Sequence, residues 1–324
     1  MKTMKIGVLG CANIAEKSMI PAIIQSKEFE LVAVSSRNLE KAEKFAKKFN
    51  CEAIEGYQNI IIREDIDCLY IPLPTGLHEE WVIKALNSNK HVLVEKSFAV
   101  NAESAKKMTD LAIKNKLIVM EDFMFQFHSQ HKFVFDLINN DEIGDVRLFR
   151  SSFGFPPLAS GNFRYNKELG GGCMLDAAAY TIKASSFILN SSISVQSANI
   201  FFDKVLNIDL YGNATLIDDK NRVSHISFGF DNYYQCNYEI WGSKGKIIAH
   251  RAFTPQPNYK PIITHEKQNY FKEYEMDEDN HFVNILKHFH NSIENNRFLF
   301  CANEVLAQSK TITNINIIAN KIFI

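Results

Sequence analysis

The sequence predicts an α/β protein: an amino-terminal doubly wound parallel sheet, followed by an α+β domain with a large open, mostly antiparallel sheet. From Met4 to about Asn140, short apolar segments alternate with amphipathic helices, which is typical of a parallel sheet covered on both faces. After Gly144, apolar and polar residues alternate with a period of two, which is typical of antiparallel strands. We therefore expect domains at residues 1–122 and 123–324, with the last helices as candidates to pack back on the first domain.

Composition limits the classes of partner and location. A chain of 324 residues with 46% hydrophobic and 23% charged residues is long and apolar enough for two cores. The net charge of -1 argues against nucleic-acid and anionic-membrane partners, and no uncharged stretch is apolar enough to span a membrane. The 6 cysteines form no C-x-x-C pair, so we expect reduced thiols and no zinc site in a cytoplasmic protein.

The segment KIGVLGCANIA near the amino terminus is typical of a strand, a glycine turn and a helix. It matches the dinucleotide fingerprint G-x-G-x-x-G/A of Rossmann folds, with Gly10 for the tight turn and Ala15 for close packing of helix on strand. Ala12 departs from the pattern by adding a methyl group at the middle position. Asn13 is expected to cap the helix, and N–H groups from Ala12 to Ile14 would face a pyrophosphate. A βα turn without nucleotide is the alternative.

The end of the second expected strand, Phe29–Ser36, carries no acidic residue to hold the ribose hydroxyls of NAD. Ser36 could instead form a hydrogen bond with a 2′-phosphate. Arg37 could bind that phosphate through two hydrogen bonds or stack on the adenine, and Lys41 would add positive charge. This pattern favours NADP(H) as cofactor. The alternative is a solvated start of the helix expected at Leu39–Phe49.

Three more strands and two more helices complete the expected parallel sheet. Their ranges are Asp67–Pro74, His91–Lys96 and Leu117–Asp122 for the strands, and Leu77–Asn87 and Ala102–Lys114 for the helices. Lys96 ends a buried strand, where partial removal from water suits it to donate a hydrogen bond or a proton. The alternative is a lysine whose stem covers the sheet edge while its ammonium stays in water.

The segments YIPLPTGLHEEWVIKAL and KHVLVEKSF resemble the Gfo/Idh/MocA oxidoreductase family. Members carry a proline-rich turn after the fourth Rossmann strand and a Glu-Lys-Pro motif after the fifth. Here the second motif is Glu95, Lys96 and Ser97, so serine replaces the proline. The resemblance places Glu95 and Lys96 at the cofactor ribose. It also implies that four residues pass close to the nicotinamide half of the cofactor: Pro72, Leu73, Pro74 and His78.

Histidine pairs are weak candidates for a metal site. His128 and His131 are spaced to share a helix face, but they lack a clearly placed third ligand. His288 and His290 flank Phe289 and point to different sides of a helix. We therefore predict no metal.

In the second half, four segments read as strands: VRLFRSSFGF, SVQSANIFF, RVSHISFGF and QCNYEIWG. Two helices near the end are expected at Asp279–Ile293 and Ala302–Asn320. An antiparallel sheet of this kind leaves one face free for substrate or for a second subunit. The resemblance implies a homodimer or homotetramer formed through this open sheet.

A second chemical signature is NFRYNKELGGGCMLDAAAYTIKAS. Its glycines, 170–172, let backbone approach a ligand closely, and Asp176 and Tyr180 then share one face of a helix. In the family, a histidine usually stands where Tyr180 stands. Tyrosine there resembles the subgroup with nucleotide-sugar 3-ketoreductases, glucose–fructose oxidoreductase and dihydrodiol or xylose dehydrogenases. Arg164 is a further candidate to bind the cofactor or a substrate phosphate. The alternatives are a core tyrosine and an aspartate that caps or forms an ion pair.

Together these residues predict an oxidoreductase that passes a hydride from NADPH to a ketone on a sugar, most simply one linked to a nucleotide. Tyr180 would protonate the developing alkoxide, and Lys96 would hold the carbonyl oxygen and ease loss of the tyrosine proton. Asp176 would bind substrate hydroxyls or orient Lys96. Several aromatic residues could offer a face to sugar or base, although packing is their usual role: Phe153, Phe155, Tyr165, Tyr233 and Tyr234.

Three other functions fit the same motifs. The first is an NADP-dependent dehydrogenase of a free aldose, polyol or dihydrodiol, because hydride transfer is reversible. The second is a redox-assisted glycosidase, which resembles the branch with histidine in place of Tyr180. The third is a non-catalytic regulator that senses NADP and would need neither Lys96 nor Tyr180.

Overall fold

The computed structural model describes residues 3–324 and forms two compact units. Unit 1 consists of the chain up to Asp122 together with Phe282–Ser309. Unit 2 consists of Phe123–His281 together with Lys310–Ile324. The chain therefore enters each unit twice.

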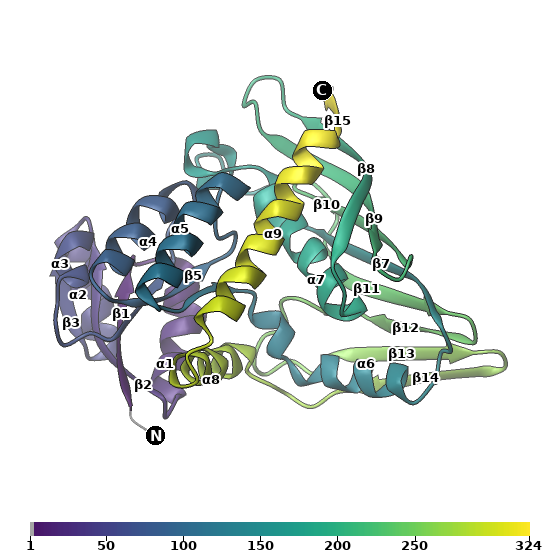
Figure 1. Ribbon diagram of the computed structural model, residues 1–324, viewed down its shortest axis with the longest axis horizontal. Coiled ribbons are helices and arrows are strands. Elements are labelled where there is room, and N and C mark those ends of the chain that lie inside the picture. The colour runs from purple at the N-terminus through teal and green to yellow at the C-terminus, as the bar shows by residue number, and fades with distance from the viewer. Residues whose placement is uncertain (1–2) are drawn as a thin grey trace. The chain divides into compact units, whose positions relative to one another are not determined.

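Unit 1 is built on a 6-stranded parallel sheet with the order β3-β2-β1-β4-β5-β6 (Figure 1). This order reverses direction at β1 and β4, as in doubly wound dinucleotide-binding sheets, and confirms the predicted fold class. The strands are β1 (Met4–Leu9), β2 (Phe29–Ser36), β3 (Glu52–Glu55), β4 (Cys68–Ile71), β5 (His91–Glu95) and β6 (Val119–Asp122).

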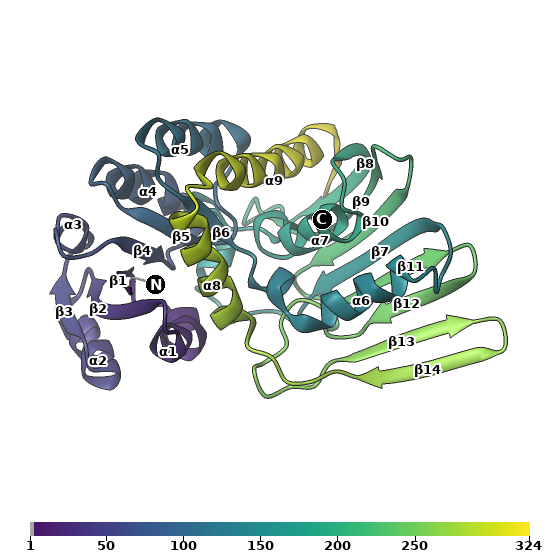
Figure 2. The same cartoon turned by 60° about the horizontal axis from the view of Figure 1, so that its bottom comes forward.

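Helices cover both faces of this sheet. Figure 2 shows α4 and α5 on one side of the strands and α1 and α2 on the other. The helices are α1 (Ile20–Gln25), α2 (Leu39–Phe49), α3 (Tyr57–Ile61), α4 (His78–Asn87), α5 (Ala102–Asn115) and α8 (His281–Glu294). Local chemistry sets the ends of α2, because the Asn38 side chain accepts a hydrogen bond from the Lys41 N–H and Asn50 adopts a left-handed conformation.

Most predicted elements of this half agree with the structure, and β2 and α2 coincide with their predicted bounds. The sequence interpretation missed β3 and α3, because a strand of 4 residues and a helix of 5 are too short to show a clear period. The capping role of Asn13 is wrong. The helix already includes Asn13, so this residue lies in its first turn rather than before it.

The core of unit 1 draws on both ends of the chain. Leu9, Val92 and Phe98 are fully buried in one hydrophobic cluster with residues of α4 and α5. Ala302 and Val305, from α9 (Phe298–Ile318), belong to the same cluster and are almost fully buried. The parallel sheet is therefore completed by side chains that follow it by almost two hundred residues in the sequence.

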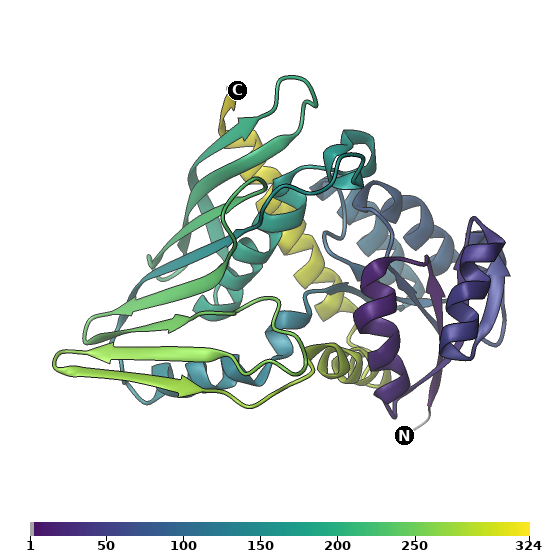
Figure 3. The same cartoon turned by 180° about the vertical axis from the view of Figure 1, so that it is seen from behind.

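Unit 2 is built on a 9-stranded sheet with the order β14-β13-β12-β11-β7-β10-β9-β8-β15. Figure 3 shows the β13–β14 hairpin at one edge and β15 at the other. Pairing is antiparallel except between β7 and β10 and between β8 and β15, so the prediction of a mostly antiparallel sheet is confirmed. The strands are β7 (Val146–Gly154), β8 (Ile193–Phe202), β9 (Asp209–Asp218), β10 (Val223–Gly229), β11 (Gln235–Gly242), β12 (Gly245–Ala249), β13 (Ile262–Lys267), β14 (Tyr270–Glu275) and β15 (Asn320–Phe323).

One face of this sheet packs against helix. A π-helical turn, Met174–Ala178, leads into α7 (Ala179–Leu189), which contacts β7 and β10. Along the strands, buried residues alternate with exposed ones such as Arg150 and Trp241, which lie on the opposite, open face. None of the helices in the described part of the chain is both long and apolar enough to cross a membrane.

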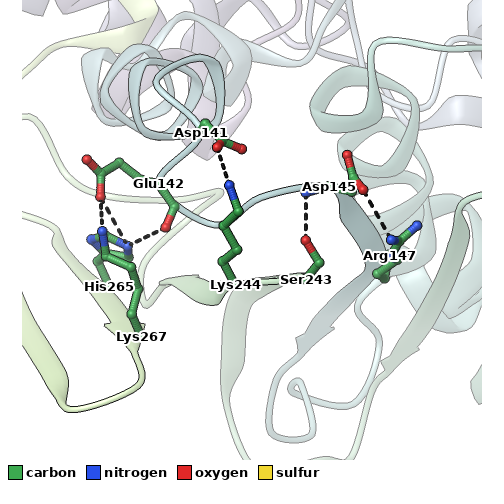
Figure 4. Close-up of polar contacts among 8 residues, drawn as sticks. All are labelled: Asp141, Glu142, Asp145, Arg147, Ser243, Lys244, His265 and Lys267. Carbon is green, nitrogen blue, oxygen red and sulfur yellow. Dashed lines mark hydrogen bonds and ion pairs between the residues drawn. The ribbon is translucent and has the colours of Figure 1, made fainter.

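Polar contacts fix the loop between α6 (Ser129–Asn139) and β7 (Figure 4). Lys244, in the β11–β12 turn, pairs with Asp141, and the Asp145 N–H donates to the Ser243 hydroxyl at 3.0 Å. Lys267 of β13 pairs with Glu142 in the same loop. The loop therefore links two hairpins on one side of β7.

Candidate active site

The turn after β1 has the geometry of a dinucleotide site. Gly10 has a φ of 129°, which L-residues rarely adopt, and its N–H donates to the Ser35 carbonyl at 3.1 Å. A Cβ at Gly10 would also come within 2.8 Å of Leu73 Cδ2, so that leucine would have to shift. The following helix has Ala15 fully buried against the sheet, while its first amides lack acceptors within the helix. This half-site fits a pyrophosphate at the positive end of the helix.

At the end of β2, a buried serine precedes two exposed cations. The Ser36 hydroxyl accepts a hydrogen bond from the Asn38 N–H at 3.2 Å, so it shapes the turn. The side chains of Arg37 and Lys41 are exposed, and both lie at the start of α2. Burial raises the pKa of the Tyr57 phenol, and the adjacent Arg37 guanidinium opposes this rise. The positive groups expected for a 2′-phosphate are therefore present at the carboxyl end of β2.

The loops after β4 and β5 are joined by one histidine. His78 is fully buried, with Nε2 2.7 Å from the Leu73 carbonyl and Nδ1 2.9 Å from the Ser97 carbonyl. Burial lowers its pKa. Pro72 and Leu73 are buried beside it, and Pro74 is partly exposed. The structure thus gives His78 a bracing role, holding the proline-rich turn against the Lys96–Ser97 loop.

Lys96 follows directly after β5, next to buried acidic groups of unit 1. Glu95 and Asp122 are register partners on β5 and β6, and the Tyr70 hydroxyl donates to Glu95 at 2.5 Å. Burial raises the pKa of both carboxyls, and Glu95 raises that of Asp122 further, while the Lys96 ammonium opposes both shifts. The Lys96–Ser97 peptide bond is cis. The lysine therefore lies next to these two carboxyl groups.

Sequence reasoning did not assign roles to Tyr70 and Asp122 beside the lysine. Both are fully buried, and Tyr70 comes from the middle of β4. The sequence offers one signal for Asp122, which is its place as the last residue of the strand adjacent to β5. Glu121 acts elsewhere, because its carboxylate accepts the Phe98 N–H at 2.8 Å.

In unit 2, the three glycines precede the π-helical turn that leads to α7. Gly172 has a φ of 112°, and a Cβ there would lie 2.1 Å from Asp209 Oδ1. Asp209, a partly buried residue at the start of β9, accepts the Met174 N–H. The close approach that the glycines permit is therefore to Asp209 of the chain itself. Sequence analysis missed Asp209, because no local pattern links it to the glycines.

Asp176 forms an ion pair with Arg164. The Arg164 Nε lies 2.5 Å from Asp176 Oδ2, and the guanidinium carbon lies 4.7 Å from the Phe163 ring centre. Both side chains are partly buried, with the Asp176 side chain 13% exposed. Arg164 and Asp176, which the sequence suggested as separate candidates, are thus paired, and each neutralises much of the other's charge.

Tyr180 lies in an aromatic cluster on α7 and is 5% exposed. Its ring centre lies 4.9 Å from that of Phe153, and its hydroxyl lies 3.9 Å from Met124 Sδ. Phe123, Phe125 and Phe253 also pack against the ring. The cluster fixes the direction of the phenol, which is what a proton donor needs.

Two histidines of unit 2, His131 and His281, are almost fully buried. His131 Nδ1 is 2.8 Å from the Tyr238 hydroxyl, and its Nε2 is 3.1 Å from the Ala252 carbonyl. Burial lowers the pKa of His131 to about 3 and that of His281 to about 3. Across residues 3–324, no group of three potential ligands is close enough to hold a metal ion.

The open face of unit 2 carries a shallow depression of about 470 Å³. Arg150, Trp241 and Lys246 line it, and Trp241 is 50% exposed. The cations there are already paired, Arg150 with Glu239 and Lys246 with Glu266. The depression belongs to the sheet surface rather than to the candidate catalytic residues.

Two family models match the chain in order. One, described as an oxidoreductase family with an NAD-binding Rossmann fold, matches residues 4–123, and the other, the GFO/IDH/MocA C-terminal domain, matches residues 131–248. The chain belongs to the Gfo/Idh/MocA oxidoreductase family. The resemblance inferred from the two sequence motifs is therefore confirmed.

Curated relatives include two enzymes of one activity and a third of another. The dTDP-3,4-didehydro-2,6-dideoxy-alpha-D-glucose 3-reductase of Saccharopolyspora spinosa is 41% identical over 84% of this chain and 82% of its own. The enzyme of the same name from Streptomyces violaceoruber is 38% identical over 82% of this chain and 78% of its own. A D-xylose 1-dehydrogenase (NADP(+)) of Haloferax volcanii is 29% identical over 81% of this chain and 80% of its own.

Among solved structures, KijD10, a 3-ketoreductase from Actinomadura kijaniata in complex with NADP and TDP-benzene, superposes with a TM-score of 0.96. It is 31% identical, and the match covers 100% of both chains. An aldose-aldose oxidoreductase from Caulobacter crescentus, 19% identical with a TM-score of 0.88 over 97% of each chain, shares the fold.

Proposed function

We propose that this protein reduces a ketone on a nucleotide-linked deoxysugar, with NADPH as the hydride donor. The observation that carries the proposal is the full-length match, at 31% identity, to a 3-ketoreductase crystallised with NADP and a TDP ligand. The local chemistry agrees with it, because Lys96 directly follows β5 and Tyr180 holds the position where the family more often has histidine.

The cofactor proposal rests on unit 1. The Gly10 turn and the start of the following helix suit the pyrophosphate, and Arg37 and Lys41 suit a 2′-phosphate. Bound NADPH would supply the hydride, and the remaining chemistry falls to the chain. Asn13, Ile14 and Arg164 remain predicted cofactor contacts, as do Glu95 and Lys96 at the ribose.

The proposed chemistry needs one proton and one orienting charge. Reduction of the ketone adds a hydride to carbon and leaves an alkoxide, which takes the Tyr180 phenol proton to give the alcohol. Lys96 donates a hydrogen bond to the same oxygen, and its charge stabilises the phenolate until solvent returns the proton. The Arg164–Asp176 pair presents a carboxylate that can accept a hydrogen bond from a sugar hydroxyl.

A substrate panel tests this function. The purified protein would be assayed at the NADPH absorbance band with dTDP-linked ketosugars and free ketoses, and in reverse with NADP⁺ and free aldoses. We expect oxidation of NADPH only with the nucleotide-linked ketone. Turnover confined to free aldoses or dihydrodiols would contradict the proposal.

A second function follows from other relatives. The Haloferax volcanii xylose dehydrogenase matches 81% of this chain, and the dihydrobenzenediol dehydrogenase of Xenopus laevis, at 32% identity, matches 53%. These support a dehydrogenase of free sugars or diols as the alternative. The lower identity or coverage of these matches makes the ketoreductase the stronger proposal.

Assembly and location complete the proposal. We infer a homodimer or homotetramer in which the open face of unit 2 meets a second copy, because this broad face leaves large side chains such as Trp241 exposed. We also place the enzyme in the cytoplasm. Its free cysteines, five of them buried, support a reducing compartment.

A further inference from the structure

Arg251 lies in the turn after β12 and is held by two tyrosines. Its guanidinium carbon is 4.8 Å from the ring centre of Tyr234 and 5.5 Å from that of Tyr259. Tyr234 precedes β11, and Tyr259 lies in the loop before β13, so separate segments provide the rings. Contacts of this kind orient a planar guanidinium without neutralising its charge.

The charge of Arg251 has no acidic partner. Within the described part of the chain, its side chain forms neither an ion pair nor a hydrogen bond, and its Nε is shielded from water without an acceptor. The other arginines of unit 2 each pair with a carboxylate: Arg147 with Asp145, Arg150 with Glu239, Arg164 with Asp176 and Arg222 with Asp218. A partly buried guanidinium left in this state is suited to bind an anion.

The turn that carries Arg251 is fixed beside the aromatic cluster of Tyr180. The Ala252 N–H donates to the Cys236 carbonyl at 2.8 Å, and the Ala252 carbonyl faces His131 Nε2 at 3.1 Å. The next residue, Phe253, has its ring centre 5.8 Å from that of Tyr180. Arg251 therefore lies two residues from a side chain that packs on the proposed proton donor, within the same unit.

We propose that Arg251 binds the diphosphate of the nucleotide-linked substrate and so selects it over a free sugar. This inference rests on the proposed function. A ketone held at Tyr180 places the diphosphate, attached to the same sugar ring, a few bonds away. A guanidinium fork matches phosphate oxygens in a bidentate manner, whereas a free sugar offers no charge. Tyr259, 38% exposed, adds an aromatic face near the same guanidinium.

Calorimetry with dTDP, thymidine and NADPH as separate probes tests the assignment. We expect the wild-type protein to bind dTDP more tightly than thymidine. Arg251→Met should weaken dTDP binding at least about tenfold, the expected loss for hydrogen bonds to a charged group, and leave thymidine and NADPH binding unchanged. Arg251→Lys keeps the charge but loses the bidentate geometry of the guanidinium. Its affinity for dTDP should lie between those of the wild-type protein and Arg251→Met. Arg147→Met, which removes an exposed arginine of the same unit, is the matched control and should bind dTDP normally.

Each contrary result has a distinct meaning. Wild-type affinity for dTDP in both Arg251 variants would overturn the role of Arg251 and leave the proposed function standing. Weaker NADPH binding with dTDP binding intact would assign the anion to the cofactor and also overturn it. A wild-type protein that turns over free sugars and binds no dTDP would remove the nucleotide-linked substrate itself.

Discussion

Glu95 and Asp122 occupy paired register positions at the carboxyl ends of β5 and β6, beside the lysine proposed for catalysis. Their pKa values are both raised, chiefly by burial, so the pair holds a proton that ordinary carboxyls would release. A carboxyl whose pKa is raised on folding contributes stability at low pH that is lost as the pH rises through the folded pKa.

This pair gives the first prediction. Asp122→Asn, which mimics the protonated carboxyl, should flatten the loss of stability as the pH rises above the ordinary carboxyl range. Glu95→Gln replaces the carboxyl that accepts the Tyr70 hydroxyl with a neutral amide, a weaker acceptor, and should cost about 1 kcal/mol of unfolding free energy at pH 7. Denaturant unfolding across pH measures both. Asp110→Asn, on an exposed pair with Lys106, is the control, and equal pH slopes in wild type and Asp122→Asn would contradict the assignment.

The second prediction concerns the proton donor and its partner. Lys96→Met and Tyr180→Phe should each lower kcat by about 10²–10⁴-fold, the usual contribution of a positioned acid, while NADPH binding stays near wild type. Stopped-flow turnover and NADPH fluorescence titration separate the two effects. Tyr211→Phe, which removes only the hydroxyl of a ring stacked on Phe201 in the sheet, should be fully active. Undiminished turnover in either active-site variant would remove that residue from the mechanism.

Cofactor preference is the third prediction. Arg37→Ala should weaken NADPH binding by about tenfold to hundredfold, because a charge-assisted bond to the 2′-phosphate is lost, and leave NADH binding unchanged. Comparing KM for the two cofactors measures the preference. Lys44→Ala on the adjacent helix α2 breaks only an exposed pair with Glu40 and serves as control. An equal loss for NADH would show that Arg37 contacts the adenine or only supports the fold.

The fourth prediction concerns stability in acid. Burial lowers the pKa of His131 from 6.5 to about 3, so stability from the neutral imidazole is complete above about pH 6.5 and is lost as the pH falls toward 3. His131→Asn should be less stable at pH 7, since contacts with Tyr238 and Ala252 go, but its stability should fall less steeply between pH 6.5 and 3. Thermal unfolding across this range measures the slope. His225→Asn changes an exposed histidine on β10 and should keep the wild-type slope, and an unchanged slope in His131→Asn would refute the prediction.

Assembly gives the fifth prediction. If the open face of unit 2 joins a second copy, Trp241→Asp should shift the protein toward monomer, because a charge replaces a large side chain that is 50% exposed. Light scattering after size exclusion gives the mass. Ile24→Asp, an exposed substitution on α1 of unit 1, should keep the wild-type mass. A wild-type protein that is already monomeric would contradict the expected oligomer.

Local chemistry made much of the fold predictable. The apolar run of β2 and the asparagine that caps α2 are both local sequence signals. The bounds of β2 and α2 coincide with the prediction. The tail beyond Gly242 was not resolved into β12, β13 and β14, whose pairing depends on hairpin contacts. The parallel pairing of β7 with β10 likewise depends on distant segments rather than on period.

The candidate site was likewise predictable only in part. Lys96 and Tyr180 could be proposed from residue type, position and family motif. The ion pair of Arg164 with Asp176 and the contact of Asp209 with the glycine turn could not, since these partners are distant in sequence and no local pattern links them. Arg251 escaped notice for a related reason, because a lone arginine shows its missing counter-charge only after folding.

The hydrophobic cluster shared by the amino-terminal sheet with Ala302 and Val305 has a consequence for synthesis in the cell. A ribosome must translate far beyond β6 before these two side chains emerge to cover the sheet. A nascent chain that stops or is cleaved after Asp122 would leave exposed the apolar surface that Ala302 and Val305 cover. Chaperones bind chains in this state and proteases degrade them. Quality control can therefore discard incomplete copies before they sequester coenzyme.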